Sequence, residues 1–278
     1  WHAWRMDNVE NYKVLAYRSP WTKYSAINDT QDMSEVNSAI AHLIDGQGFT
    51  VLDRLVSKDK ANDIREYVLA HLGDAQENTP GDLNLTDLIR GGETFRDLVT
   101  HPRLLAIAHQ LLGPDCKLAA MGAKVLMPGC GEGALHVDYP YWAMDPGMPV
   151  TPALMMQVIW MMEPFSKENG GTWIAPGSQK YQSKVDERRF AREAVQIEGL
   201  AGDAVISHGL LWHRTAMNHA TKPRVALLIN YSQLSIRPMR ELGPFSEEFL
   251  AEASDQLKAL LPINYGRSLR DRLKRHYS

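Results

Sequence analysis

A histidine and an aspartate separated by one residue form the stretch of this sequence best suited to chemistry. His136 and Asp138 lie within residues 134–138, where apolar and polar side chains alternate as in a short strand. Because side chains alternate along a strand, an imidazole nitrogen and a carboxylate oxygen would lie side by side on one face. With a second histidine they would form a set of two histidines and one carboxylate, which binds Fe(II) and leaves coordination positions open.

Three later histidines compete for the remaining ligand position. His208 is predicted to end a strand, where it could support the site or be structural. His219 lies in a polar turn over residues 218–223 and is predicted to be exposed. His213 follows an apolar run and is the candidate that we expect to complete the metal site.

An arginine opens an apolar strand a short distance after these histidines. Arg224 precedes the run Val-Ala-Leu-Leu-Ile at residues 225–229. A guanidinium that enters an apolar run is costly unless it is paired, and its planar fork suits a carboxylate. The pattern predicts a binding site for a dicarboxylate cosubstrate, and the alternative is an arginine at a strand edge whose charged end reaches water.

These residues and a second stretch resemble the phytanoyl-CoA dioxygenase family of Fe(II)/2-oxoglutarate-dependent oxygenases. The second stretch is residues 168–178, which contain Asn-Gly-Gly followed by Pro-Gly-Ser, and Gln179 stands where the family usually has a histidine. The spacing between His213 and Arg224 is close to that of the family. The resemblance extends over about residues 48–232.

The resemblance implies the fold and the main site residues. The expected fold is mainly β with flanking helices, a double-stranded β-helix or jelly-roll barrel similar to that of the cupins. His136, Asp138 and His213 would be the catalytic iron ligands, and Arg224 would hold the far carboxylate of 2-oxoglutarate. Thr172 and Thr215 match positions that contact this cosubstrate in the family; without the resemblance they would be an ordinary strand residue and a turn residue.

The resemblance also implies a reaction. With Fe(II), 2-oxoglutarate and O₂ as cofactor and cosubstrates, the enzyme would hydroxylate an unactivated C–H bond of a small metabolite and release succinate and CO₂. A carboxylate at Asp138 favours hydroxylation over halogenation, since related halogenases have a small residue there. Desaturation, epimerisation and ring formation use the same oxidant and stay open. Alternatives from other classes are a non-catalytic jelly-roll protein and a cupin-like protein that binds Zn or Mn.

Residues of the substrate pocket are harder to assign. Tyr139, Tyr141 and Trp142 follow the metal motif directly and resemble the corresponding segment of ectoine-hydroxylase-like members, where they could contact substrate or pack on the barrel rim. Gln157 lies in a methionine-rich predicted strand, and alternation alone does not decide whether it faces the site or the outer side.

The elements that must position these residues form one predicted domain over residues 1–278. Residues 1–114 are expected to be a mostly helical flank, with helices at about 58–72 and 102–112, and residues 236–278 a C-terminal helical segment. Residues 115–235 contain short apolar runs separated by turn residues, which predicts the jelly-roll core. Strands are expected at 117–127, 134–138, 153–162, 171–175, 204–207 and 224–232, and a loop that could cover the site at 74–87.

Composition narrows the function further. The 278 residues are 44% apolar and carry a net charge of −3, so the chain is not expected to bind nucleic acid. Two cysteines exclude a disulfide scaffold and a zinc–thiolate module, and the longest apolar run is too short to span a membrane. With no export signal visible, we expect a cytoplasmic enzyme acting on a small molecule, of an oligomeric state that the sequence does not indicate.

Overall fold

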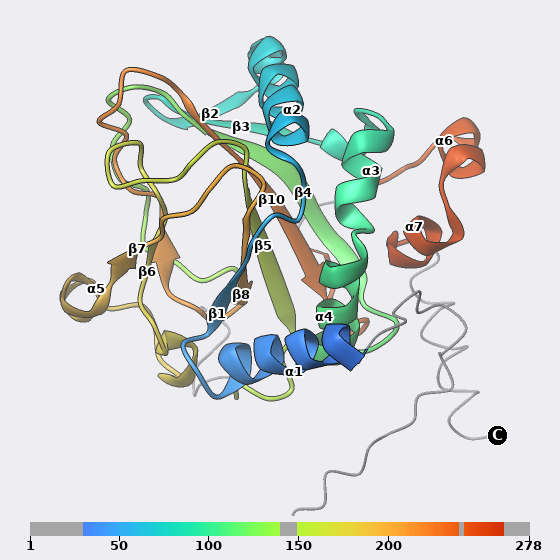
Figure 1. The fold of residues 1–278 in the computed structure, drawn as a ribbon, viewed down its shortest axis with the longest axis horizontal. Coiled ribbons are helices and arrows are strands. Elements are labelled where there is room, and N and C mark those ends of the chain that lie inside the picture. The colour runs from blue at the N-terminus through green and yellow to red at the C-terminus, as the bar shows by residue number, and fades with distance from the viewer. Residues whose placement is uncertain (1–29, 140–148, 239–241, 264–278) are drawn as a thin grey trace, which may run out of the picture.

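Two antiparallel sheets face each other and enclose the site (Figure 1). The computed structural model describes residues 30–139, 149–238 and 242–263. The large sheet has the strand order β1-β8-β5-β10-β4-β3-β2 and the small one β7-β6-β9. The strands are β1 Phe49–Leu52, β2 Gln76–Thr79, β3 Asp82–Thr86, β4 Lys117–Leu126, β5 Met155–Met161, β6 Trp173–Ile174, β7 Val195–Gln196, β8 Ala204–His208, β9 His213–Arg214 and β10 Arg224–Ser232.

The central strands β5, β8 and β10 of the large sheet are largely buried, and their side chains divide between two environments. On β5, Met156, Val158 and Trp160 pack into the core under the helices, whereas Ile159 and Met161 belong to a second cluster between the sheets. This alternation follows from the two-residue period of a strand. It explains why β5 is apolar at every position except Gln157, because both faces of this strand are buried.

Helices cover the outer face of the large sheet and supply most of the core on that side (Figure 1). The helix α4 contacts α1, β5 and β10. It begins with Pro102 in its first turn and ends at Gly113, whose positive φ of 96° suits glycine. The helices are α1 Thr30–Ile44, α2 Lys58–Ala70, α3 Glu93–Val99, α4 Pro102–Leu112, α5 Glu187–Glu193, α6 Glu247–Glu252 and α7 Asp255–Leu260.

The small sheet has its own apolar cover. Phe190 of α5 packs with Trp212, Ala175 and Val137 on the side that faces away from the large sheet. Val137 therefore lies on the outer side, and its neighbours His136 and Asp138 are left for the space between the sheets.

The fold confirms the predicted jelly-roll class, and it differs from the expected elements in three places. The helix at residues 102–112 and the strand at 224–232 have the predicted ends, and four more of the six predicted core strands are present with ends shifted by one or two residues. The strand expected at 134–138 is wrong: only a single bridge pairs His136 with His213. The loop expected at 74–87 is mostly a β-hairpin, β2 and β3, and together with β1 it brings strands from before residue 115 into the large sheet.

Candidate active site

The predicted metal ligands meet on the inner side of the small sheet. His213 of β9 pairs with Ile174, whose side chain lies in the cluster between the sheets, so that His213 faces the same way. His136 N–H donates to the His213 carbonyl at 3.1 Å, and His213 N–H donates back to the His136 carbonyl at 3.0 Å. Asp138 is two residues beyond His136 and shares its face.

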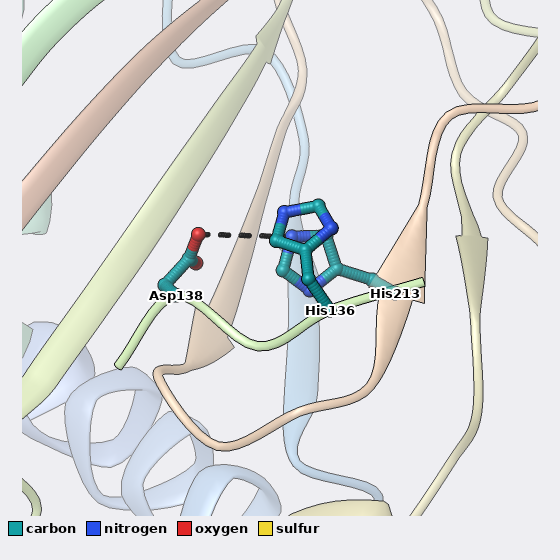
Figure 2. A group of neighbouring side chains, drawn as sticks. All are labelled: His136, Asp138 and His213. Atoms are coloured by element: carbon teal, nitrogen blue, oxygen red, sulfur yellow. Dashed lines mark ion pairs between the residues drawn. The ribbon is translucent and has the colours of Figure 1, made fainter. Parts of the chain in front are cut away.

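The three side chains converge on one point (Figure 2). One ligand atom from each of His136, Asp138 and His213 lies within 4.8 Å of the others. The His213 Nε2 atom is 3.7 Å from Asp138 Oδ1, and the two imidazole rings are 4.3 Å apart between centroids. Two imidazoles and a carboxylate at this spacing fit a facial triad around Fe(II).

Backbone carbonyls fix the ring nitrogen that each histidine presents. The Nδ1 atom of His136 lies 2.8 Å from the Ala134 carbonyl oxygen, and Nδ1 of His213 lies 2.9 Å from that of Leu211. A carbonyl oxygen only accepts, so both Nδ1 atoms carry the proton and both Nε2 atoms have a free lone pair. Such bonds orient metal-binding histidines in many proteins.

Burial sets the protonation of the three groups. It lowers the pKa of His136 and of His213, so both imidazoles are neutral and able to bind a metal ion. Burial also raises the pKa of Asp138, whose Oδ2 atom is buried and has no hydrogen-bond partner among the described residues. A divalent cation between the three groups would stabilise the charged carboxylate and would be coordinated by this oxygen. The donor set and the unpartnered Asp138 oxygen therefore fit Fe(II).

Arg224 lies opposite the triad, on the inner face of the large sheet. Its side chain is fully buried, Nη2 donates to the Gly170 carbonyl at 2.7 Å, and its guanidinium carbon lies 4.4 Å from the centre of the Phe165 ring. Its Nε atom has no partner, and no ion pair links it to a carboxylate among the described residues. Burial lowers its pKa to about 10, so it stays charged at neutral pH. The site fits a carboxylate of 2-oxoglutarate.

The two predicted threonine contacts lie near the site without a visible role. Thr172 is buried. Its carbonyl accepts a hydrogen bond from Ile197 N–H, which extends the β6–β7 ladder by one residue beyond Trp173. Thr215 is two residues beyond His213 and shares its face by alternation, and its carbonyl accepts from Gly133 N–H. Contact of either hydroxyl with the cosubstrate stays a prediction.

The competing histidines are not placed for metal binding. In His208, Nδ1 accepts from Leu210 N–H at 3.1 Å and Nε2 lies 3.0 Å from the Val150 carbonyl oxygen, so the backbone occupies both nitrogens. His219 is exposed, as predicted.

The predicted substrate residues divide into two groups. Tyr139 is half-buried, and Gln157 is 4% exposed on the inner face of β5. Tyr141 and Trp142 lie outside the described residues.

Some site residues were not predicted from the sequence. Phe165 and Gly170 hold the guanidinium of Arg224, and Asn230 stands beside Gln157 in the large sheet. The inward position of Asn230 could have been found by counting in twos from Arg224 along the same strand. The contacts of Phe165 and Gly170 depend on loop conformation and leave no such signal.

The model of the phytanoyl-CoA dioxygenase (PhyH) family matches residues 44–226. The chain belongs to this family. The match spans all three proposed metal ligands and Arg224, so the predicted family is confirmed.

Similarity to individual known proteins is distant. A dioxygenase of Aspergillus fumigatus is 32% identical over 62% of this chain and 55% of its own length, so the chain spans about half of that relative. An ectoine dioxygenase of Nocardia farcinica is 23% identical over 72% of this chain and 79% of its own length. The solved structure of SnoN, an alpha-ketoglutarate-dependent epimerase from nogalamycin biosynthesis, is 18% identical with a TM-score of 0.59, covering 78% of this chain and 98% of SnoN. That likeness supports the fold.

Proposed function

We propose that this chain is a non-haem Fe(II)/2-oxoglutarate-dependent oxygenase that hydroxylates an unactivated C–H bond of a small metabolite. The observation that carries the proposal is the meeting of two elements between the sheets. A triad of neutral histidines and a carboxylate faces inward from the small sheet. A buried arginine, which forms no ion pair with a carboxylate in the described part of the chain, faces inward from the large sheet. Membership of the PhyH family supports it.

Each residue has a distinct task in this function. His136 and His213 would bind the metal through Nε2, held in that tautomer by the Ala134 and Leu211 carbonyls. Asp138 would be the third metal ligand, and Arg224 would bind a carboxylate of the cosubstrate. When bound, Fe(II) with 2-oxoglutarate and O₂ supplies the oxidising power for a C–H bond and yields succinate and CO₂. The protein would position the reactants, and the apolar cluster between the sheets would help to exclude water from them.

The substrate is proposed to be a small molecule. The net charge of −3 gives no basic surplus for nucleic acid, and no helix among the described residues is long and apolar enough to cross a membrane. Both cysteines are buried and unpaired. This is typical of proteins from a reducing compartment, and we place the reaction in the cytoplasm.

Anaerobic addition of Fe(II) and 2-oxoglutarate tests the proposal directly. An iron chelate of the 2-oxo acid absorbs visible light, so a charge-transfer band should appear with the intact chain and disappear in Asp138→Ala. Absence of the band from folded, iron-loaded protein would contradict the proposal. Succinate release screened over a metabolite panel would then find the substrate, and product analysis would separate hydroxylation from desaturation, epimerisation and ring formation.

A further inference from the structure

Three polar side chains form a row across the inner face of the large sheet. Gln157 of β5 pairs in register with Ser207 of β8 on one side and Asn230 of β10 on the other. Their exposed fractions are 4%, 2% and 8%. Along β5, the inward neighbours of Gln157 are Met155 and Ile159, so on this strand the polar position is flanked by apolar ones. We call Ser207, Gln157 and Asn230 the polar row.

Two atoms of the polar row lack a good hydrogen-bond partner among the described residues. The Gln157 Oε1 atom is buried with no such partner there, and the contact given for Asn230 Nδ2 is with the thioether sulfur of Met155, at 3.9 Å. On the opposite face of β10, the Tyr231 hydroxyl donates to the Val99 carbonyl at 2.7 Å. Buried polar groups in proteins are nearly always paired, so an unpaired acceptor in this wall points to a partner from outside the chain.

The polar row lies close to the metal ligands. Tyr139, which follows the ligand Asp138, donates its N–H to the Gly209 carbonyl at 3.1 Å, and Gly209 donates to the Met155 carbonyl at 2.9 Å. The strand end that carries Gln157 is therefore two backbone hydrogen bonds from the metal-binding segment.

Arg224 lies at the other end of the same wall. It precedes Asn230 by six residues on β10, which corresponds to about 20 Å along the strand. A cosubstrate held between Arg224 and the triad would therefore leave the polar row free for another molecule.

Solvent reaches the space in front of this wall. On β4 and β10 the inward positions Ala120, Gly122 and Leu228 are partly exposed, although the outward residues between them are buried. Among the charged residues of the inner face, Lys124 and Asp82 are paired with each other at 2.7 Å, so they present little net charge.

We infer that the polar row recognises the substrate of the proposed oxygenase, and that this substrate is a neutral, mainly apolar small molecule with a hydroxyl or amide N–H group directed at Gln157. The inference rests on the proposed function. A carboxamide oxygen accepts a hydrogen bond and repels an anionic acceptor, whereas Met155, Ile159 and Leu228 suit an apolar body. A site built around a substrate donor rejects an analogue that lacks the donor, because the acceptor is then left buried and unpaired.

Matched probes test this inference. Borneol and bornyl methyl ether share an apolar body and differ in one O–H group, and 2-piperidone and N-methyl-2-piperidone differ in one N–H group. Binding to the chain loaded with Mn(II) and 2-oxoglutarate can be titrated by the paramagnetic broadening of the probe signals in NMR, which also reports nearness to the metal. We expect the donor-bearing member of each pair to bind at least tenfold more tightly than the blocked member.

Variants assign the preference to Gln157. Gln157→Met keeps the side-chain length but removes the acceptor and should abolish the preference, whereas Gln157→Glu keeps an acceptor oxygen and should retain it. Gln196→Met is the matched control, because Gln196 pairs with Trp173 on the outer side of the small sheet. Equal binding of both members to the wild type, binding of neither, or a preference that survives in Gln157→Met would each overturn the inference.

The outcome is separable from that of the proposed function. If the charge-transfer band forms but the wild type does not prefer the donor-bearing probes, the assignment of the polar row is wrong and the oxygenase proposal stands. If the band is absent while the preference depends on Gln157, the row is a binding site and the oxygenase proposal fails.

Discussion

Both histidines of the proposed metal site are oriented by the same kind of local hydrogen bond. Each donates its Nδ1 proton to the carbonyl two residues earlier, from His136 to Ala134 and from His213 to Leu211. The bond needs only a suitable local backbone, so each ring is oriented by its own segment. The sequence indicated the two ligands of the His-x-Asp pair and favoured His213 as the third. It could not indicate the ring tautomer, which depends on carbonyl directions that no residue type encodes.

Arg224 should be needed for binding of 2-oxoglutarate rather than for folding of the metal site. Arg224→Lys keeps a positive charge but loses the planar fork, and a charge-assisted hydrogen bond is worth about 1.5–3 kcal/mol. We therefore expect the dissociation constant of 2-oxoglutarate, titrated through the charge-transfer band, to rise at least about tenfold. Arg214→Lys is the control, because Arg214 pairs with Glu132 at 2.9 Å on the outer side of β9. Unchanged affinity in Arg224→Lys would refute the assignment.

His208 should make the metal-free protein less stable in acid. Its Nδ1 atom accepts from Leu210 N–H, so the protonated ring would lose this bond, and burial lowers its pKa below the ordinary value. Below about pH 6.5 the imidazole is protonated in the unfolded chain but stays neutral in the folded chain. The contribution of His208 to the free energy of unfolding is therefore fully present above about pH 6.5 and decreases as the pH falls below it.

The variant His208→Gln tests that pH dependence. It should remove up to about 1.4 kcal/mol per pH unit from the slope of unfolding free energy between pH 6 and 5 in urea titrations. The exposed His219→Gln should leave the slope as it is. Identical slopes for His208→Gln and the wild type would show that His208 does not titrate in this way.

At the scale of elements, the long apolar segments were predictable and the short edge elements were not. The helix α4 has a strong apolar stripe with proline at its start and glycine after its end, and β5 and β10 are long and apolar. The hairpin β2–β3 is polar, and its pairing with β4 depends on contacts distant in sequence. The segment around His136 pairs with β9 at a single bridge. Whether this segment counts as a strand therefore depends on how far it pairs with β9, which its own residues do not indicate.

Gln179, where the family usually has a histidine, holds the end of one helix. It is completely buried, and its Nε2 atom contacts the carbonyl oxygens of Leu43, Ile44 and Gly46 at 3.2–3.4 Å, at the C-terminus of α1. Gln179→Leu leaves these acceptors buried and unpaired, which should lower the free energy of unfolding by about 1–3 kcal/mol.

The readouts for Gln179→Leu separate helix capping from catalysis. Urea unfolding should show the loss of stability, and the charge-transfer band should keep its position and its 2-oxoglutarate dependence. Gln76→Leu, on the exposed strand β2, is the matched control and should change stability little. A stable Gln179→Leu protein with a weakened band would instead tie this residue to the active site.

At the scale of the whole molecule, the proposed site is divided between the two sheets. His136, Asp138 and His213 lie on the small sheet and the adjoining segment, and Arg224 and the polar row lie on the large sheet. The family resemblance predicted this architecture together with the metal ligands. The polar row could not be predicted from the sequence. It depends on the register in which β8, β5 and β10 pair, and the residues of each strand alone do not define that register.

Ligands bound by residues of both sheets should stabilise the folded chain against unfolding. Mn(II) together with 2-oxoglutarate binds only the folded chain, and at a hundredfold excess over the dissociation constant it should add about 2.7 kcal/mol, or about 5–10 °C in melting temperature. The metal alone should give part of this shift. The cosubstrate alone should give little, because its chelating end needs the metal.

Two variants separate the contributions of the sheets to this shift. Asp138→Ala should lose the response to the metal and therefore to the pair, whereas Arg224→Lys should keep the metal response and lose the additional shift from 2-oxoglutarate. Calorimetric melting curves with and without each ligand measure both. If Asp138→Ala were stabilised by metal as much as the wild type, the cation would be bound elsewhere, and the division of the site between the sheets would be wrong.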